Sequence, residues 1–147
     1  MLLLVLWLVC GVVRGEAVDW LWEAWADLRH AERSLNLGDY NWACFAAQQA
    51  AEKALKAFFI AVLRRRPPHI HDLTVLYGEV GGELELSEDV TARLGRLSSY
   101  YVVSRYPNAG VLRPSRGVSR VEAEDAIRLA REVVEAVSRR LGFTPEG

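Results

Sequence analysis

Arginines, histidines and tyrosines gather in two stretches of this sequence, and these side chains together are suited to binding a phosphate group. The first stretch is the segment RRRPPHIH at residues 64–71, which contains His69 and His71. The second covers residues 90–121, which hold no acidic residue and six arginines: Arg93, Arg96, Arg105, Arg113, Arg116 and Arg120. Guanidinium groups donate several hydrogen bonds to phosphate, and aromatic rings stack on bases. The pattern therefore predicts a site for a phosphate with a stacked base, near Tyr100, Tyr101 and Tyr106.

The two basic stretches could meet in space. In an up-and-down helical bundle, the loop after the second helix and the loop after the fourth lie at the same end. The arginines also have a plainer interpretation, as a solvated surface or as partners of the acidic residues at 79–89. The sequence leaves both interpretations open.

Other common kinds of site lack support. His69 and His71 have only Asp72 beside them, too few ligands for a metal ion, so Asp72 or His71 is expected to cap a helix instead. The segment GEVGGE lacks the spacing and the lysine of a phosphate-binding loop. No histidine lies near Ser98 and Ser99 to activate a serine nucleophile. We therefore predict neither a metal site nor a cofactor.

Length and composition restrict the function further. The chain has 147 residues and a formal net charge of −1, which fits one domain and argues against a general polyanion binder. Cys10 and Cys44 lie in apolar stretches without metal-ligand or disulfide spacing, so we expect small buried residues in a cytoplasmic protein. Only Lys53 and Lys56 among the 18 basic residues are lysine, a composition compatible with a thermophilic source.

Residues 1–17 are predicted to be an apolar extension of the domain. The run MLLLVLWLVCGVV is shorter than the roughly 20 residues that span a bilayer, and no basic residue precedes Arg14 as a secretion signal would require. A signal or anchor is therefore the less favoured interpretation, and no membrane partner is expected. The extension could instead reflect a start codon assigned too early, or serve as a hydrophobic arm in self-association.

The remaining sequence predicts an all-α domain over residues 18–142, followed by a tail at 143–147. Apolar residues recur every three or four positions, and no alternating stretch is long enough for a strand. Start and stop signals divide the domain into an up-and-down bundle of about five helices. The expected helices begin near Asp19, Asn41, Asp72, Ser87 and Ser119, and they end near Gly38, Arg65, Val80, Ser104 and Leu141.

Two of these helices carry further signals. Ser119 and Glu122 form a capping box for the last helix. The second helix is the longest and most apolar, so it should lie at the centre of the bundle. One line of its positions places Gln48 or Gln49, Glu52 and Lys56 between phenylalanines, and these polar groups need partners.

Three segments of the domain occur in a familiar order: YNWACFAAQQAAEKALKAFF at 40–59, HIHDLTVL at 69–76 and YYVVSRYPNAG at 100–110. Together they resemble the HEPN domain family of small prokaryotic helical proteins, over about residues 18–140. The resemblance implies a helical bundle that forms a homodimer and works beside a minimal nucleotidyltransferase protein. It also implies a link to toxin–antitoxin systems, because many members of the wider superfamily are toxins that cleave RNA without a metal and are neutralised by that partner.

The ribonuclease motif of the superfamily is incomplete in this chain. The resemblance places it on a late helix, as an arginine followed about four to six residues later by a histidine that acts as acid or base. Here the last helix has no histidine, and Arg105 is followed by YPNAGV. The pairs Arg64 with His69 and Arg65 with His71 have the spacing but lie in a proline-containing loop. We therefore favour a protein without enzyme activity.

The first hypothesis is a HEPN module that binds a nucleotide or an RNA phosphate. Its predicted site residues are Glu52, Lys53, Lys56, His71, Asp72, Tyr101, Arg105 and Tyr106. Glu52 and Lys56 also have a plainer interpretation, as an ion pair one helical turn apart. The alternative hypothesis is a metal-independent ribonuclease toxin in which His71 acts with a loop arginine such as Arg105. The expected dimer interface is the first helix, with Trp20, Trp22 and Trp25.

Overall fold

Six α-helices and no strand occur among the residues that the structure describes. The computed structural model describes residues 2–145, with side chains from residue 15 onward. The helices are α1 (Leu2–Leu37), α2 (Tyr40–Phe58), α3 (Leu73–Val80), α4 (Glu88–Val103), α5 (Pro114–Gly117) and α6 (Arg120–Leu141). A π-helical turn, η1 (Phe59–Leu63), follows α2, and a 3-10 turn, η2 (Gly81–Glu83), follows α3. The predicted all-α fold is confirmed, with α5 as a single extra turn.

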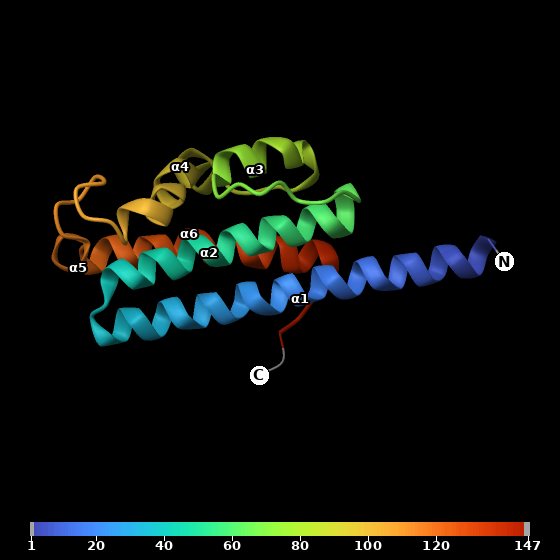
Figure 1. The fold of residues 1–147 in the computed structure, drawn as a ribbon, viewed down its shortest axis with the longest axis horizontal. Coiled ribbons are helices and arrows are strands. Elements are labelled where there is room, and N and C mark those ends of the chain that lie inside the picture. The colour runs from blue at the N-terminus through green and yellow to red at the C-terminus, as the bar shows by residue number, and fades with distance from the viewer. Residues whose placement is uncertain (1, 146–147) are drawn as a thin grey trace.

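Helix α2 lies at the centre of the fold, as its apolar sequence predicts. It contacts all five of the other α-helices. Figure 1 shows α1 and α6 running along its length, with α1 in the opposite direction. The buried residues of α2 include seven alanines: Ala43, Ala46, Ala47, Ala50, Ala51, Ala54 and Ala57. Alanine favours helix, and its small side chain allows neighbouring helices to pack closely on several sides.

Helix α1 differs from the prediction, because it continues without a break through the apolar extension. Asp19 lies well inside α1 rather than at its start. The extension contains no proline and is rich in leucine, so nothing in it ends a helix. Ala17 and Leu21 are buried, and the part of α1 before them extends past the other helices (Figure 1). Within the described part of the chain, no helix is long and apolar enough to cross a membrane.

The end of α2 is the other departure from prediction. The expected helix continues to Arg65, whereas α2 changes to the π-helical turn η1 at Phe59. Arg64 then takes a left-handed conformation, with a φ of 56°, and ends the turn. Pro67 and Pro68 follow, and they prevent the helix from resuming.

Helix α6 has the bounds that its sequence predicts. The Ser119 hydroxyl accepts a hydrogen bond from the N–H of Glu122, and the Glu122 carboxylate accepts one from the N–H of Ser119. Gly142 ends the helix with a φ of 66°. Phe143 then packs edge-on against Trp22 of α1. Local signals therefore fix both ends of α6.

Replacing Ser119 with alanine should lower the free energy of unfolding by about 1 kcal/mol, because the change removes one hydrogen bond of the capping box. Chemical denaturation measures the loss. Ser115→Ala is the matched control, since Ser115 is exposed. Equal losses in the two variants would contradict a specific role for the cap.

Candidate functional site

The site is built around a buried carboxylate. Glu52 lies on α2 with only 5% of its surface exposed. Gln48 Nε2 donates to Glu52 Oε1 at 3.2 Å, and Lys56 Nζ donates to Glu52 Oε2 at 2.9 Å. His71 Nδ1 lies 3.0 Å from Glu52 Oε1. A buried charge is costly unless it is paired and hydrogen-bonded, and these three partners meet that requirement.

The same contacts fix the segment that precedes α3. Gln48 Nε2 also donates to the carbonyl oxygen of His71 at 3.0 Å. On the other side, Ser98 Oγ of α4 accepts a hydrogen bond from the N–H of Leu73 at 3.0 Å. Helix α2, the segment before α3, and α4 therefore meet at His71.

The His71 ring is held in one orientation. An ionised carboxylate only accepts hydrogen bonds, so Nδ1 carries the proton shared with Glu52, and Nε2 lies on the opposite edge of the ring. The ring stacks on Tyr101 with 3.9 Å between centroids and an interplanar angle of 12°. The side chain is 46% exposed, and it borders a hollow of about 450 Å³ that Ser98 and Ser99 also line. Nε2 can therefore exchange a hydrogen bond or a proton with a ligand.

Arg105 is the cation of the site. Its Nε donates to the carbonyl oxygen of Tyr101 at 2.8 Å, and its Nη2 donates to the same oxygen. The guanidinium carbon lies 4.3, 4.6 and 5.1 Å from the ring centroids of Phe45, Tyr101 and Tyr106. The faces of aromatic rings attract the charge. Within the described residues, no hydrogen bond engages Nη1, so its N–H groups are available to an anion.

Within the described part of the chain, no carboxylate neutralises Arg105. Two other arginines are also half-buried, and both have acidic partners: Arg93 pairs with Asp125, and Arg131 pairs with Glu32. Burial alone would raise the pKa of Asp125, but its arginine neighbours hold that pKa below its ordinary value. A half-buried guanidinium without such a partner favours an anionic ligand.

The structure brings seven of the eight predicted site residues together: Glu52, Lys56, His71, Asp72, Tyr101, Arg105 and Tyr106. The eighth, Lys53, faces elsewhere. Lys53 Nζ pairs with Asp27 of α1 at 2.6 Å. Asp72 caps α3, as predicted, because its Oδ1 accepts a hydrogen bond from the N–H of Thr74 at 2.9 Å. A hydrogen bond from the Thr74 hydroxyl lowers the pKa of Asp72 below its ordinary value.

The two basic stretches meet at His71, which stacks on Tyr101, but the arginines of the first stretch do not reach Arg105. Arg65 lies over the ring of Phe59, whereas Arg105 lies over the ring of Phe45. The two phenylalanines are fourteen residues apart, which is about 21 Å along a helix. The chain after α2 turns back toward the middle of the bundle (Figure 1), so only its end at His71 reaches the site.

Several arginines of residues 90–121 form surface ion pairs, mainly with acidic residues of α6. Of the acids at 79–89 that the plainer interpretation named, Asp89 pairs with Arg93. Arg96 pairs with Glu122, and Arg120 pairs with Glu124. Exposed pairs of this kind contribute little to stability. Tyr100 is buried and accepts a hydrogen bond from Arg96, and burial raises the pKa of its hydroxyl. Tyr100 therefore belongs to the contact between α4 and α6 rather than to the phosphate site.

Sequence reasoning missed the roles of Phe45, Gln48 and Ser98. The helical spacing showed that Gln48 would need a partner, but it could not show that the partner is the backbone of His71. Phe45 lies on the same face of α2 as Glu52, in the line of positions described above. No signal in the sequence indicates that Ser98 binds the first turn of α3.

Cys44 is buried, as its apolar surroundings in the sequence predict. Burial raises the pKa of its thiol to about 12, so the thiol stays protonated. Cys10 lies outside the residues whose side chains the structure describes. Among the described residues, no three His, Cys, Asp or Glu side chains gather as ligands for a metal ion.

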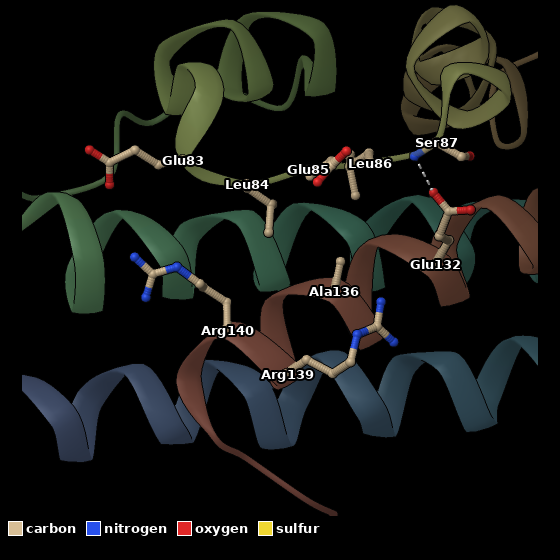
Figure 2. A pocket seen from close by; sticks show the side chains of 9 residues that line it. All are labelled: Glu83, Leu84, Glu85, Leu86, Ser87, Glu132, Ala136, Arg139 and Arg140. Atoms are coloured by element: carbon tan, nitrogen blue, oxygen red, sulfur yellow. Dashed lines mark hydrogen bonds between the residues drawn. The ribbon is translucent and has the colours of Figure 1, made fainter.

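A second hollow, of about 660 Å³, lies between residues 83–87 and the end of α6 (Figure 2). Its walls carry both acidic and basic side chains: Glu83, Glu85, Glu132, Arg139 and Arg140. The Glu132 carboxylate already accepts a hydrogen bond from the N–H of Ser87 at 2.8 Å. The mixed charges favour neither an anion nor a cation, so this hollow is a weaker candidate than the surface at Arg105.

The fold and the site define a small all-α protein in which a polar network on the central helix supports an aromatic and cationic surface. The HEPN domain family model matches residues 17–141, and the chain belongs to that family.

Solved structures with the same fold include three from microbial sources. TT1696 from Thermus thermophilus is 42% identical, with a TM-score of 0.76, over 84% of this chain and 97% of that one. ST0689, an archaeal HEPN homologue, is 25% identical, with a TM-score of 0.65, over 85% and 97% of the two chains. The HEPN domain protein tm0613 from Thermotoga maritima is 28% identical, with a TM-score of 0.64, over 86% and 99%. No curated protein matched the sequence.

Replacing Lys56 with methionine should lower the free energy of unfolding by about 3 kcal/mol, because the buried Glu52 carboxylate would lose its cation. Chemical denaturation at neutral pH measures the change. Adding Glu52→Gln to this variant should recover part of the loss, since the buried charge is then removed.

Lys53→Met is the matched control for this experiment. Lys53 lies three residues away, in a partly exposed pair with Asp27, so its replacement should cost less than about 1 kcal/mol. Similar losses at the two lysines would contradict the importance of the buried network.

Proposed function

We propose that this chain is a HEPN-domain module that binds the phosphate of a nucleotide or of RNA at the surface formed by His71, Tyr101, Arg105 and Tyr106, here named the Arg105 site. The observation that carries the proposal is the half-buried Arg105 guanidinium, which has no carboxylate partner in the described part of the chain. A phosphate oxygen would supply the missing negative charge and accept hydrogen bonds from Nη1.

The contacts of His71 support the same proposal. Glu52 and Gln48 hold the ring and its backbone in place before any ligand arrives. A ligand therefore does not have to order this side chain, which reduces the entropic cost of binding. With Nδ1 engaged by Glu52, the other ring nitrogen is the one available to a phosphate oxygen when the imidazole is protonated.

The proposal includes a homodimer that acts with a minimal nucleotidyltransferase protein, as in toxin–antitoxin systems. Both partners follow from the resemblance of residues 18–140 to the HEPN family. One feature of the fold is compatible with a dimer: Trp22 on α1 is 38% exposed, and partly exposed aromatic residues are common at interfaces.

Arg105→Ala should weaken binding of ADP at least tenfold, because a hydrogen bond to a charged group contributes about 1.5–3 kcal/mol. Isothermal titration calorimetry measures the affinity. Arg105→Lys should bind with intermediate affinity, since lysine keeps the charge but not the planar donor group.

Arg116→Ala is the control for the ADP experiment. Arg116 lies on α5 and is exposed, so its replacement should leave the affinity unchanged. An Arg105→Ala variant that binds as tightly as the wild type would remove this site from the proposal.

A metal-independent ribonuclease is the second candidate function. The observation that favours it is that His71 and Arg105 both contact the ring of Tyr101, while Glu52 fixes the His71 tautomer. A carboxylate that orients a histidine is a common support for general acid–base catalysis, and a guanidinium can stabilise charge on a phosphate. The second candidate function thus uses the same site. Its histidine, His71, precedes α3, whereas the superfamily motif has its histidine on a late helix.

Incubation of the purified protein with labelled RNA in EDTA separates the two functions. The binding module should leave the RNA intact, because the last helix lacks the histidine of the superfamily motif. Cleavage that disappears in both His71→Ala and Arg105→Ala would instead establish the ribonuclease. Cleavage that survives in both variants would come from a contaminant and support neither role.

A further inference from the structure

We propose that Trp42 and Phe45 add a base-stacking subsite to the Arg105 site, so that the ligand is a segment of single-stranded RNA in which bases flank the bound phosphate. This inference rests on the proposed function and narrows its ligand. It uses a row of aromatic rings in which Tyr101 and His71 are predicted site residues, whereas Trp42 and Phe45 are not.

The aromatic row is continuous in space. The Trp42 and Phe45 rings meet edge to face with 6.0 Å between centroids. Phe45 lies 6.2 Å from Tyr101, and Tyr101 stacks on His71 at 3.9 Å. The row therefore runs from the first turn of α2 to the segment before α3.

The position of Arg105 divides this row into two arms. The guanidinium lies over the two middle rings, those of Phe45 and Tyr101. Trp42 extends the row on one side of the charge, and His71 extends it on the other. A phosphodiester held at Arg105 would thus have an aromatic ring within reach of the base on each side, whereas a mononucleotide has only one base to place.

The outer rings are open to a ligand. Trp42 is 48% exposed, and Tyr106, which also contacts Arg105, is 53% exposed. Large apolar rings left this exposed favour a partner that covers them. Nucleobases stack on aromatic side chains in single-stranded nucleic acid sites, and the unpaired cation among the rings matches the charge of the RNA backbone.

Two labelled oligomers of equal charge test the inference by fluorescence anisotropy at one fixed salt concentration. One is an octamer of uridine, and the other is an octamer of abasic nucleotides. The wild-type protein should bind the uridine octamer about tenfold more tightly, because only that ligand offers bases for stacking. Trp42→Leu should reduce its affinity to that of the abasic octamer, and Trp42→Tyr should keep most of the preference.

Val121→Ala is the matched control, because Val121 is an exposed apolar residue of α6 that lies outside the aromatic row. Its replacement should change neither affinity. Arg105→Ala should weaken both oligomers. If it weakens neither, the Arg105 site and the inference fail together. If neither oligomer binds while ADP still does, the inference fails and the proposed function stands.

Two other outcomes would overturn the inference alone. In the first, Arg105→Ala weakens both oligomers but Trp42→Leu leaves the uridine octamer unaffected. In the second, light scattering shows that Trp42→Leu converts a dimer to monomers, which would make the aromatic row an interface between two copies of this chain. Far-UV circular dichroism confirms that each variant keeps its helical content.

Discussion

A carboxylate on the central helix of a bundle stays charged only if the surrounding elements bring donors to it. Glu52 receives two donors from its own helix and a third from His71. The third contact has the wider effect, because it requires the chain after α2 to return along the helix instead of continuing from its end. The bond from Gln48 to the backbone of His71 strengthens that return. One charge on α2 thus helps to decide where α3 begins and which part of α4 it meets.

The arginines of residues 90–121 differ in their partners, and the net charge of −1 does not show that difference. Arg93 and Arg96 pair with acidic residues of α6, and so link α4 to that helix. Arg105 lies past the end of α4, among aromatic rings. An arginine paired within the fold stabilises it modestly, whereas a partly buried one without a carboxylate leaves electrostatic energy to be gained from a ligand. The proposed function therefore rests on how the charges are paired rather than on their sum.

Signals confined to one turn of chain were readable from the sequence. The capping box at Ser119, the cap at Asp72 and the stop at Gly142 depend on neighbours within a few residues, and all three are present. The start of the first helix was predicted wrongly at Asp19. A possible cap does not begin a helix where the preceding residues also favour helix. The assembly of the site depended on the path between α2 and α3. That path follows from the contacts of Glu52 and Gln48, which no local pattern encodes.

Arg105 also has a structural duty at the end of α4. Its own N–H bonds to the carbonyl oxygen of Val102, so the carbonyl oxygen of Tyr101 lacks the usual helical donor and accepts the guanidinium instead. The side chain that supplies the cation of the proposed site is therefore the one that completes the last turn of the helix. A substitution at this position therefore removes a hydrogen bond that ends the helix at the same time as it removes a cation from the surface.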